Sequence, residues 1–350
     1  MKSSILKIIL VLSILGNSLA KAQDVHFSQF YENAILRNPS LTGIFTGDYR
    51  VTVNYRNQWS SFATAFNTTL INAETKIPIR NDGGDVLSVG LCAYYDKAGT
   101  INFNSLATYL ALNYSKALDD EHHTFLSVGL AGGYLQRSID VSKMTFGNQY
   151  VAGNFNNSVG AQNISNNHLY NFDVGAGVSV NSSIGSENKT QYYIGIAGYH
   201  VQKPKQTFND DGNFVRLNTR WTGSLGLSTA LSESIYLVLH GYAQWQDPYQ
   251  EIIGGGMFSF SSRDIEKHTT LTLSAGCYYR WQDAVIPTLK LEYKNWGLVL
   301  SYDVNTSGKR MYINQAGGYE ISLFSRGFFP RNKDSRDALI CPRFESTLIY

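Results

Sequence analysis

Seven histidines are the residues of this chain whose type most readily supports acid–base or nucleophilic chemistry. A nucleophilic site would need a histidine beside a serine near a strand end, but most of these histidines lie in turn-like or terminal segments. His240 differs, because it lies within a strand-like run with the parity opposite to Leu237, Leu239 and Trp245. We expect its ring to face the lumen of the barrel that the strand pattern predicts below. No Gly-x-Ser-x-Gly elbow precedes a helix, so the sequence predicts no hydrolase and no catalytic residue.

The sequence motifs for a metal or cofactor site are as weak as those for a catalytic site. Residues 119–123 read Asp-Asp-Glu-His-His, and such side chains suit a divalent cation. The run occupies a short polar turn, however, in which we expect these side chains to be solvated. The three glycines at 254–256 lack the Gly-Lys-Ser/Thr of a phosphate loop. Residues 210–213 lack the later glutamate of a calcium loop. The sequence therefore predicts no cofactor and no metal site.

The first 22 residues have the three parts of an export signal. Lys2 and Lys7 precede an apolar run, and Ala20-Lys21-Ala22 fits the small-x-small cleavage rule, so the mature chain is expected to begin at Gln23. The apolar run is roughly a dozen residues, short of the about 20 that a spanning helix needs. An uncleaved anchor helix is the alternative.

Charge sets a further limit on the function. The chain has 29 basic and 27 acidic residues, and residues 1–22 contain lysines but no acid, so export leaves a nearly neutral protein. Lysine and arginine form no dense cluster of the kind that binds nucleic acid. We expect no nucleic-acid partner.

A recurring run of about ten residues, in which apolar side chains alternate with small or polar ones, dominates the mature chain. About fourteen such runs follow one another, an even number that is typical of a bacterial transmembrane β-barrel. In lipid every backbone polar group must be paired within the protein, so a sheet can span only when it is closed. We therefore predict an all-β outer-membrane barrel of about 14 antiparallel strands. The runs lie near 49–58, 67–76, 86–96, 105–117, 124–138, 170–181, 191–202, 219–230, 235–246, 250–260, 271–281, 284–293, 297–304 and 317–324.

Aromatic and glycine residues agree with a barrel. Many of the 23 tyrosines lie at the ends of runs, where they would form the aromatic girdles of a barrel. Neighbours such as Tyr94 and Tyr95 must place one ring on each face, so some tyrosines line the lumen. Glycines inside runs, such as Gly129 and Gly175, suit a crowded lumen wall. A soluble β-sandwich is the alternative, but its strands average about five or six residues.

The order of the runs predicts four segments. They are a signal peptide at 1–22, a periplasmic N-terminal arm at 23–48, the barrel at 49–324 and a periplasmic C-terminal tail at 325–350. The long connections 139–169 and 203–218 then fall on the outer side, as long loops of such barrels do.

Several segments of the mature chain carry a family resemblance. They include Gln23-Asp24, residues 26–30, Asn38-Pro39, residues 56–59, residues 283–287, residues 317–323 and the ending 341–344. Together they resemble the PorP/SprF family, outer-membrane proteins of the type IX secretion system of Bacteroidetes. The resemblance implies a non-enzymatic outer-membrane barrel that supports type IX secretion, surface attachment or gliding. Its implied partners are secretion components of the periplasm or outer membrane, a cognate secreted adhesin, and outer-membrane lipid.

The two arms that flank the barrel are rich in aromatic residues and arginine, which suits contact with a partner or plugging of the lumen. The candidate partner-binding residues are Phe27, Phe30, Tyr31, Arg37, Arg326, Phe328, Phe329, Arg343 and Phe344.

A passive porin or small-ligand channel is the alternative function. Residues of lumen parity would then line a wet pore. They include Asn113, Asp173, Lys290, Glu292 and Lys294.

Overall fold

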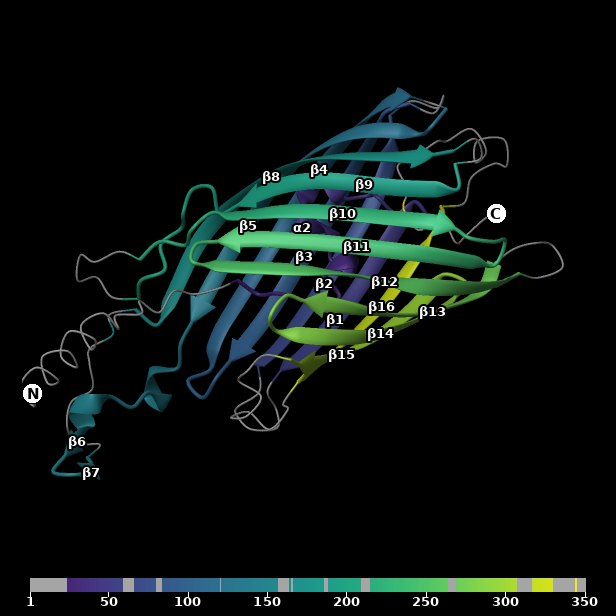
Figure 1. The fold of residues 1–350 in the computed structure, drawn as a ribbon. Helices are drawn as coiled ribbons and strands as arrows, with labels where there is room; N and C mark the ends of the chain where they lie inside the picture. Colours follow the sequence, from purple (N-terminus) through teal and green to yellow (C-terminus); the bar gives the residue numbers. More distant parts are fainter. Residues whose placement is uncertain are drawn as a thin grey trace, which may run out of the picture.

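A computed structural model describes residues 24–58, 66–79, 84–119, 121–156, 164, 166–185, 188–208, 215–263, 269–306, 317–329 and 344. Fourteen strands of this part of the chain form one closed antiparallel barrel (Figure 1). The predicted fold class and strand number are confirmed. None of the helices among the described residues is long and apolar enough to cross a membrane.

Thirteen of the barrel strands pair with the next barrel strand along the chain, and the last pairs with the first. The barrel strands are β1 (Tyr49–Gln58), β2 (Phe66–Pro78), β3 (Val86–Ala98), β4 (Phe103–Asp119), β5 (Thr124–Ser138), β8 (His168–Ile184), β9 (Thr190–Tyr199), β10 (Arg220–Ala230), β11 (Ile235–Gln246), β12 (Tyr249–Arg263), β13 (Thr269–Arg280), β14 (Ala284–Tyr293), β15 (Trp296–Asn305) and β16 (Gly318–Gly327). The connection between β5 and β8 contains the short 3-10 helices η3 (Val141–Lys143) and η4 (Gly147–Gln149) and a small hairpin of β6 (Tyr150–Val151) and β7 (Asn154–Phe155).

Pairing of β1 with β16 closes the barrel. Tyr49 lies opposite Gly327, and the register continues without a shift to Gln58 opposite Gly318. We call the end of the barrel where β1 begins and β16 ends the terminal rim, and the opposite end the loop rim. The connections from β5 to β8 and from β9 to β10 both lie at the loop rim, because both leave strands that run toward it. Closure leaves no sheet edge, which satisfies the backbone in lipid.

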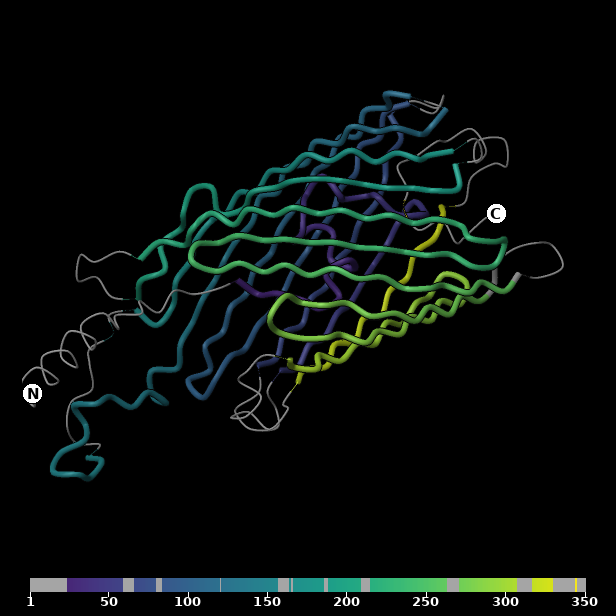
Figure 2. Tube along the Cα trace, in the orientation of Figure 1, coloured from purple at the N-terminus to yellow at the C-terminus, as the bar shows by residue number. Residues whose placement is uncertain are grey.

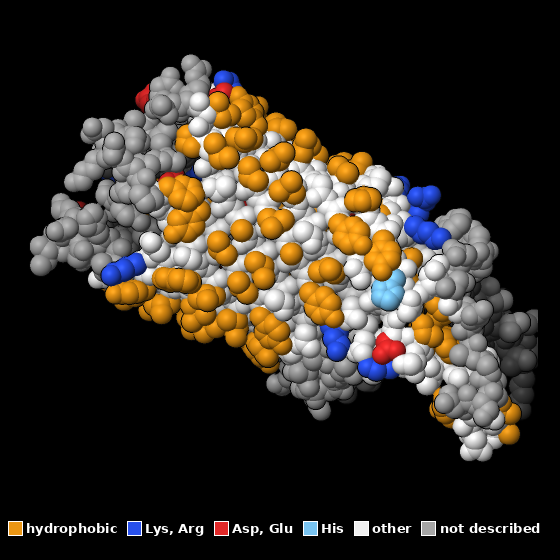
Figure 3. Space-filling view, turned by 180° about the vertical axis from the view of Figure 1, so that it is seen from behind, with side chains coloured by type: hydrophobic (Ala, Val, Ile, Leu, Met, Phe, Trp, Pro, Cys, Tyr) orange, Lys and Arg blue, Asp and Glu red, His pale blue; other side chains and the backbone are white. Residues whose placement is uncertain are grey.

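The two faces of the wall differ as the period-two pattern predicts. Large apolar side chains such as Leu110 and Leu130 are exposed on the outside, while Tyr94 is buried in the lumen and its neighbour Tyr95 is exposed. Apolar side chains are spread over the face of the outer wall that Figure 3 shows, between the rims. Lys294 is an exception, because it lies in the turn between β14 and β15 and is exposed instead of lining the lumen.

The segment 24–48, which we call the arm, lies inside the barrel (Figure 2). It forms η1 (Phe30–Glu32), α2 (Ala34–Arg37) and η2 (Pro39–Leu41), and every residue is buried except Val25 and His26, which are partly buried. From its sequence this segment is expected on the periplasmic side of the barrel, but the structure places it in the lumen. The apolar side chains of the arm are buried there against the inner wall.

The arm runs the length of the lumen. At the terminal rim the amide of Asp48 donates to the carbonyl of Gly327 over 2.7 Å. At the loop rim the amide of Asp24 donates to the side-chain oxygen of Gln246, the last residue of β11, over 3.3 Å. The described start of the arm and the start of β1 are therefore at opposite ends of the barrel.

Candidate functional site: the occupied lumen

Wall glycines make room for the middle of the arm. A Cβ on Gly129 would lie 2.2 Å from the nitrogen of Ser40 and 2.3 Å from the carbonyl carbon of Pro39. A Cβ on Gly177 would lie 2.1 Å from the side-chain oxygen of Asn38. Real Cβ atoms do not approach other atoms this closely, so the backbone of the arm contacts the wall where the wall lacks side chains. The glycines inside the runs serve a crowded lumen, as the sequence predicts.

Asn38 and Pro39 fix the arm at this contact. The Oδ1 atom of Asn38 accepts hydrogen bonds from the amide of Ser40 at 2.9 Å and from its hydroxyl at 2.7 Å, which caps η2. Proline at the first helical position has no amide that would need a partner. The Nδ2 atom of Asn38 donates to the carbonyl of Ile196 in β9 over 3.2 Å. A local cap and a wall contact thus use the same amide side chain.

At the loop rim, Asp24 is surrounded by cationic groups. Its carboxylate lies 2.5 Å from Nε2 of His200, 3.2 Å from the Arg220 guanidinium and 3.8 Å from that of Arg137. His200 also lies 2.8 Å from Asp173. Burial alone would raise the pKa of Asp24, but His200 and Arg220 lower that pKa further than burial raises it, so the net shift is far below the usual range. Burial lowers the pKa of His200, but Asp24 and Asp173 raise it to above its ordinary value.

Deeper in the lumen, two acids of the wall hold the first turn of the arm. Glu320 accepts hydrogen bonds from the amides of Ser28 at 2.7 Å and Gln29 at 3.1 Å, while Asp303 accepts one from the Ser28 hydroxyl at 2.6 Å. Arg56 lies 3.0 Å from Asp303 and donates to the carbonyl of His26 over 2.7 Å. The wall therefore binds the arm through both amides and carbonyls of its backbone.

An aromatic cluster packs the arm against β11 and β13. Tyr31 stacks on both His240 and Tyr278, at 5.0 Å between ring centroids in each case, and the rings of His240 and Tyr278 lie 6.3 Å apart. Phe30 stacks on Tyr242 at 5.6 Å. The lumen-facing position predicted for His240 is confirmed, since its side chain is buried within this cluster.

Near the terminal rim, one glutamate of β2 binds both the arm and its neighbouring strand. Glu74 accepts a hydrogen bond from the amide of Gly43 over 2.9 Å and forms an ion pair with Arg50 at 2.7 Å. The Phe45 ring lies 4.9 Å from the Arg50 guanidinium and 4.7 Å from the Lys76 ammonium group. Charged groups of the wall thus hold the arm near both rims.

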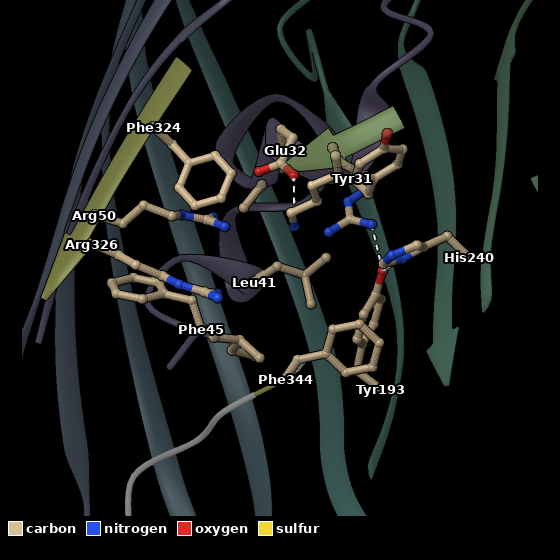
Figure 4. Close-up of a pocket in the computed structure, with 14 residues that line it drawn as sticks. Tyr31, Glu32, Leu41, Phe45, Arg50, Tyr193, His240, Phe324, Arg326 and Phe344 are labelled. Carbon is tan, nitrogen blue, oxygen red and sulfur yellow. Dashed lines mark hydrogen bonds and ion pairs between the residues drawn. The ribbon is translucent and has the colours of Figure 1, made fainter. Parts of the chain in front are cut away.

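A cavity of about 30 Å³ remains between the arm, the wall and the tail. Arg50 and Arg326 lie on one side of it and Tyr193 and His240 on the other (Figure 4). Phe344, the one described residue of the distal tail, also lines it, and its ring lies 4.8 Å from that of Tyr193.

The candidate partner-binding residues fall into three groups. Most of them are buried in the lumen: Phe27, Phe30, Tyr31, Arg37, Arg326 and Phe344. Near the terminal rim, Phe329 is 42% exposed and Phe328 is half-buried. Arg343 lies outside the described residues. Their role in binding a partner stays a prediction, and the contacts that the structure gives the buried ones are with the barrel itself.

The wall residues that hold the arm, such as Glu320, Asp303 and Arg56, are not among the candidate partner-binding residues that the sequence predicts. Their signal is present in the sequence, because Glu320 and Asp303 interrupt strand runs at positions that face the lumen. A charged side chain that faces the interior of a narrow barrel needs a partner there.

The acidic and histidine-containing turn at 119–123 uses its groups locally. Asp119 accepts hydrogen bonds from the amides of Glu121 and His122, and its carboxylate lies 2.9 Å from the His122 ring. These contacts are those of a polar turn.

Comparison with known proteins gives a family match and a fold match. The crystal structure of a Pseudomonas aeruginosa FadL homologue is similar at a TM-score of 0.52 and 10% identity, over 83% of this chain and 92% of that one. The CymD monoaromatic hydrocarbon channel is similar at 0.50 and 9%, over 86% and 94%. At such identities the likeness concerns the fold alone. No curated protein sequence matches. A family model described as type IX secretion system membrane protein PorP/SprF matches residues 19–324.

Proposed function

Because the chain belongs to the PorP/SprF family of type IX secretion system membrane proteins, we propose that it is a closed outer-membrane barrel that binds other proteins at its two rims. In this role it supports secretion, surface attachment or gliding without passing substrate through its own lumen. Cleavage of the signal peptide before Gln23 belongs to the same proposal.

Occupation of the lumen by the arm carries this proposal. All but two of residues 24–48 are buried, and wall charges hold the arm near both rims and, through the ion pair of Lys290 with Glu32, between them. A solute that entered at the loop rim would have to displace these buried ion pairs, which is costly. The porin alternative needs an open lumen, and the likeness to hydrocarbon channels concerns the fold alone.

The terminal rim is the proposed contact for periplasmic secretion components. Phe329 is exposed there and lies 5.4 Å from the ring of Tyr49, between ring centroids. Its amide donates to the Asp48 carboxylate over 2.9 Å, which fixes the chain beyond β16 beside the end of the arm. A partner bound at this position would contact the segment that closes the lumen.

The loop rim is the proposed contact for a secreted adhesin. The hairpin of β6 and β7 exposes Tyr150, Val151 and Phe155, and the first and last of these pack their rings 5.7 Å apart. Exposed aromatic side chains of this kind commonly anchor protein interfaces.

The test uses the tagged full-length protein in its own bacterium, with the variants Phe329→Ser and Tyr150→Ser/Phe155→Ser. We expect the first to lose periplasmic secretion components from the purified complex and the second to lose the secreted protein. Leu130→Ala, a change on the lipid-facing wall, is the control and should retain both. Unchanged complexes and unchanged secretion in both variants would contradict the proposal.

A further inference from the structure

Asp24 supplies, at the loop rim, the carboxylate that two arginines of the inner wall need. It lies 3.2 Å from the guanidinium of Arg220 and 3.8 Å from that of Arg137. Within the described part of the chain, no other carboxylate forms an ion pair with either arginine. Arg220 is 5% exposed, and a buried guanidinium without a counter-charge is unfavourable. This end of the lumen therefore requires a carboxylate, whichever chain carries it.

His200, directly after β9, adds a third cationic group to the same site. Its Nε2 atom lies 2.5 Å from the Asp24 carboxylate, and its Nδ1 atom lies 2.8 Å from that of Asp173. Burial raises the pKa of Asp24, but His200 and Arg220 lower it further, to far below the usual range. The site therefore binds an ionised carboxylate.

Beside this carboxylate site, the wall binds the main chain of the arm. Glu320 accepts hydrogen bonds from the amides of Ser28 at 2.7 Å and Gln29 at 3.1 Å. Arg56 donates to the carbonyl of His26 over 2.7 Å. These contacts use main-chain atoms of the arm, so another peptide of the same conformation would make them as well.

The wall also selects one side chain of this segment. Phe27 is 5% exposed and belongs to an apolar cluster with Leu70, Tyr94 and Leu135 of the wall. An aromatic residue three positions after an acid therefore fits this end of the lumen, because the acid reaches the cationic groups while the ring enters the apolar cluster.

The first turn of the arm is the part best placed to exchange. Val25 and His26 are the two residues of the arm that are partly buried, and residues 24–27 belong to no helix or strand. This turn can leave the wall while the aromatic cluster of Phe30 and Tyr31 stays in place and keeps the lumen closed. An incoming segment that brings its own carboxylate restores the ion pairs of the arginines, so the penalty for a buried unpaired charge is avoided.

We propose that the loop-rim end of the lumen is a binding site for a short acidic peptide segment of a secreted partner, and that residues 24–29 are its exchangeable occupant. The segment carries an aromatic residue three positions after its acid. That the partner is a secreted protein rests on the proposed function, which places such a protein at the loop rim. The chemistry of the site rests on the contacts of Asp24, Phe27 and the main chain between them and Gln29.

The test measures binding of an acetylated, fluorescently labelled peptide, Asp-Val-His-Phe-Ser-Gln, which has the sequence of residues 24–29, to the full-length protein in detergent. Asp24→Asn weakens the hold on the native first turn and leaves the three cationic groups in place. We expect this variant to bind the peptide at least about tenfold more tightly than the wild type, in which the arm occupies the site. A peptide with asparagine in place of the aspartate should bind the variant at least about tenfold more weakly.

Further variants separate the site from a general loosening of the arm. In the Asp24→Asn background, Arg220→Gln should abolish the preference for the acidic peptide, whereas Arg216→Gln, in an exposed loop, should retain it. Phe27→Ala vacates the aromatic position and covers the case in which Asp24→Asn does not fold. It should likewise bind the peptide at least about tenfold more tightly than the wild type. The wild type, although it binds weakly, should show the same preference for the acidic peptide.

Equal binding of the acidic and asparagine peptides overturns the proposal, as does absence of binding to both Asp24→Asn and Phe27→Ala. The measurement contains no partner protein, so its outcome is independent of the co-purification test of the two rims. Failure of peptide binding leaves the rim contacts standing, and failure of co-purification leaves the peptide site standing.

Discussion

The backbone amide of Ser28 donates to Oε2 of Glu320 over 2.7 Å, which joins the first turn of the arm to the last strand of the barrel. Glu320 lies on β16 opposite Arg56 of β1, at the seam where the barrel closes. Arg56 in turn binds the arm through the carbonyl of His26. The arm is thus bound by both strands of the seam, and its binding site is complete only when the barrel has closed.

Glu320→Gln should loosen the arm. The change removes the negative charge that accepts the amides of Ser28 and Gln29, and hydrogen bonds to charged groups contribute about 1.5–3 kcal/mol each. We expect faster proteolysis within residues 24–48 of the folded protein in detergent and a lower free energy of unfolding. Glu233→Gln, in the exposed turn between β10 and β11, is the matched control. Equal cleavage rates in the two variants would show that Glu320 does not hold the arm.

Gly129→Ala should displace the arm from the wall. The added methyl group would overlap the backbone of Pro39 and Ser40, and overpacking of this kind costs about 1–3 kcal/mol. Gly132→Ala, on the same strand with nothing within 4 Å of the added Cβ, should be close to wild type. Unfolding midpoints in one detergent measure the difference. Similar midpoints for both variants would mean that the arm does not contact β5 at Gly129.

The pair of Asp24 and His200 should make the docking of the arm depend on pH. The pKa of His200 is raised in the folded protein. The stability that its charged form adds to the folded state is therefore fully present below about pH 6.5, its ordinary pKa, and is lost as pH rises through the raised value. The pKa of Asp24 is lowered in the folded protein. The stability that its carboxylate adds to the folded state is therefore fully present above about pH 3.9 and is lost as pH falls through the lowered value.

The measurement compares unfolding midpoints of the wild type and His200→Gln across pH. Their difference should be largest between about pH 4 and 6.5 and should shrink on the alkaline side. A difference that grows with rising pH would contradict the assigned charge of His200.

The two-residue alternation of apolar and polar side chains in the strands explains how far the fold was predictable from sequence. Alternation fixes which face each side chain occupies, so the strand runs, the opposite faces of Tyr94 and Tyr95 and the lumen position of His240 follow from the pattern. The pattern does not fix where a strand ends, and this explains why Lys294 was wrongly expected to line the lumen. That residue continues the parity of β14 but belongs to the next turn.

The position of the arm could not be predicted in the same way. Aromatic residues and arginine suit a protein partner and a lumen equally well, so the composition of residues 23–48 left both possibilities open. The contacts that decide between them join distant positions, such as Ser28 with Asp303 and Asp24 with His200. No local pattern encodes such pairings, although lumen-facing charges in the strands indicate that some partner fills the interior.

Ion conductance across planar bilayers tests the closed lumen most directly. The wild type is compared with a protein in which residues 24–47 are deleted, after heat-modifiable gel migration has established that both are folded. The structure predicts no steady conductance for the wild type and steady open channels for the deletion variant. Steady conductance of the wild type equal to that of the deletion variant would contradict a lumen closed by the arm.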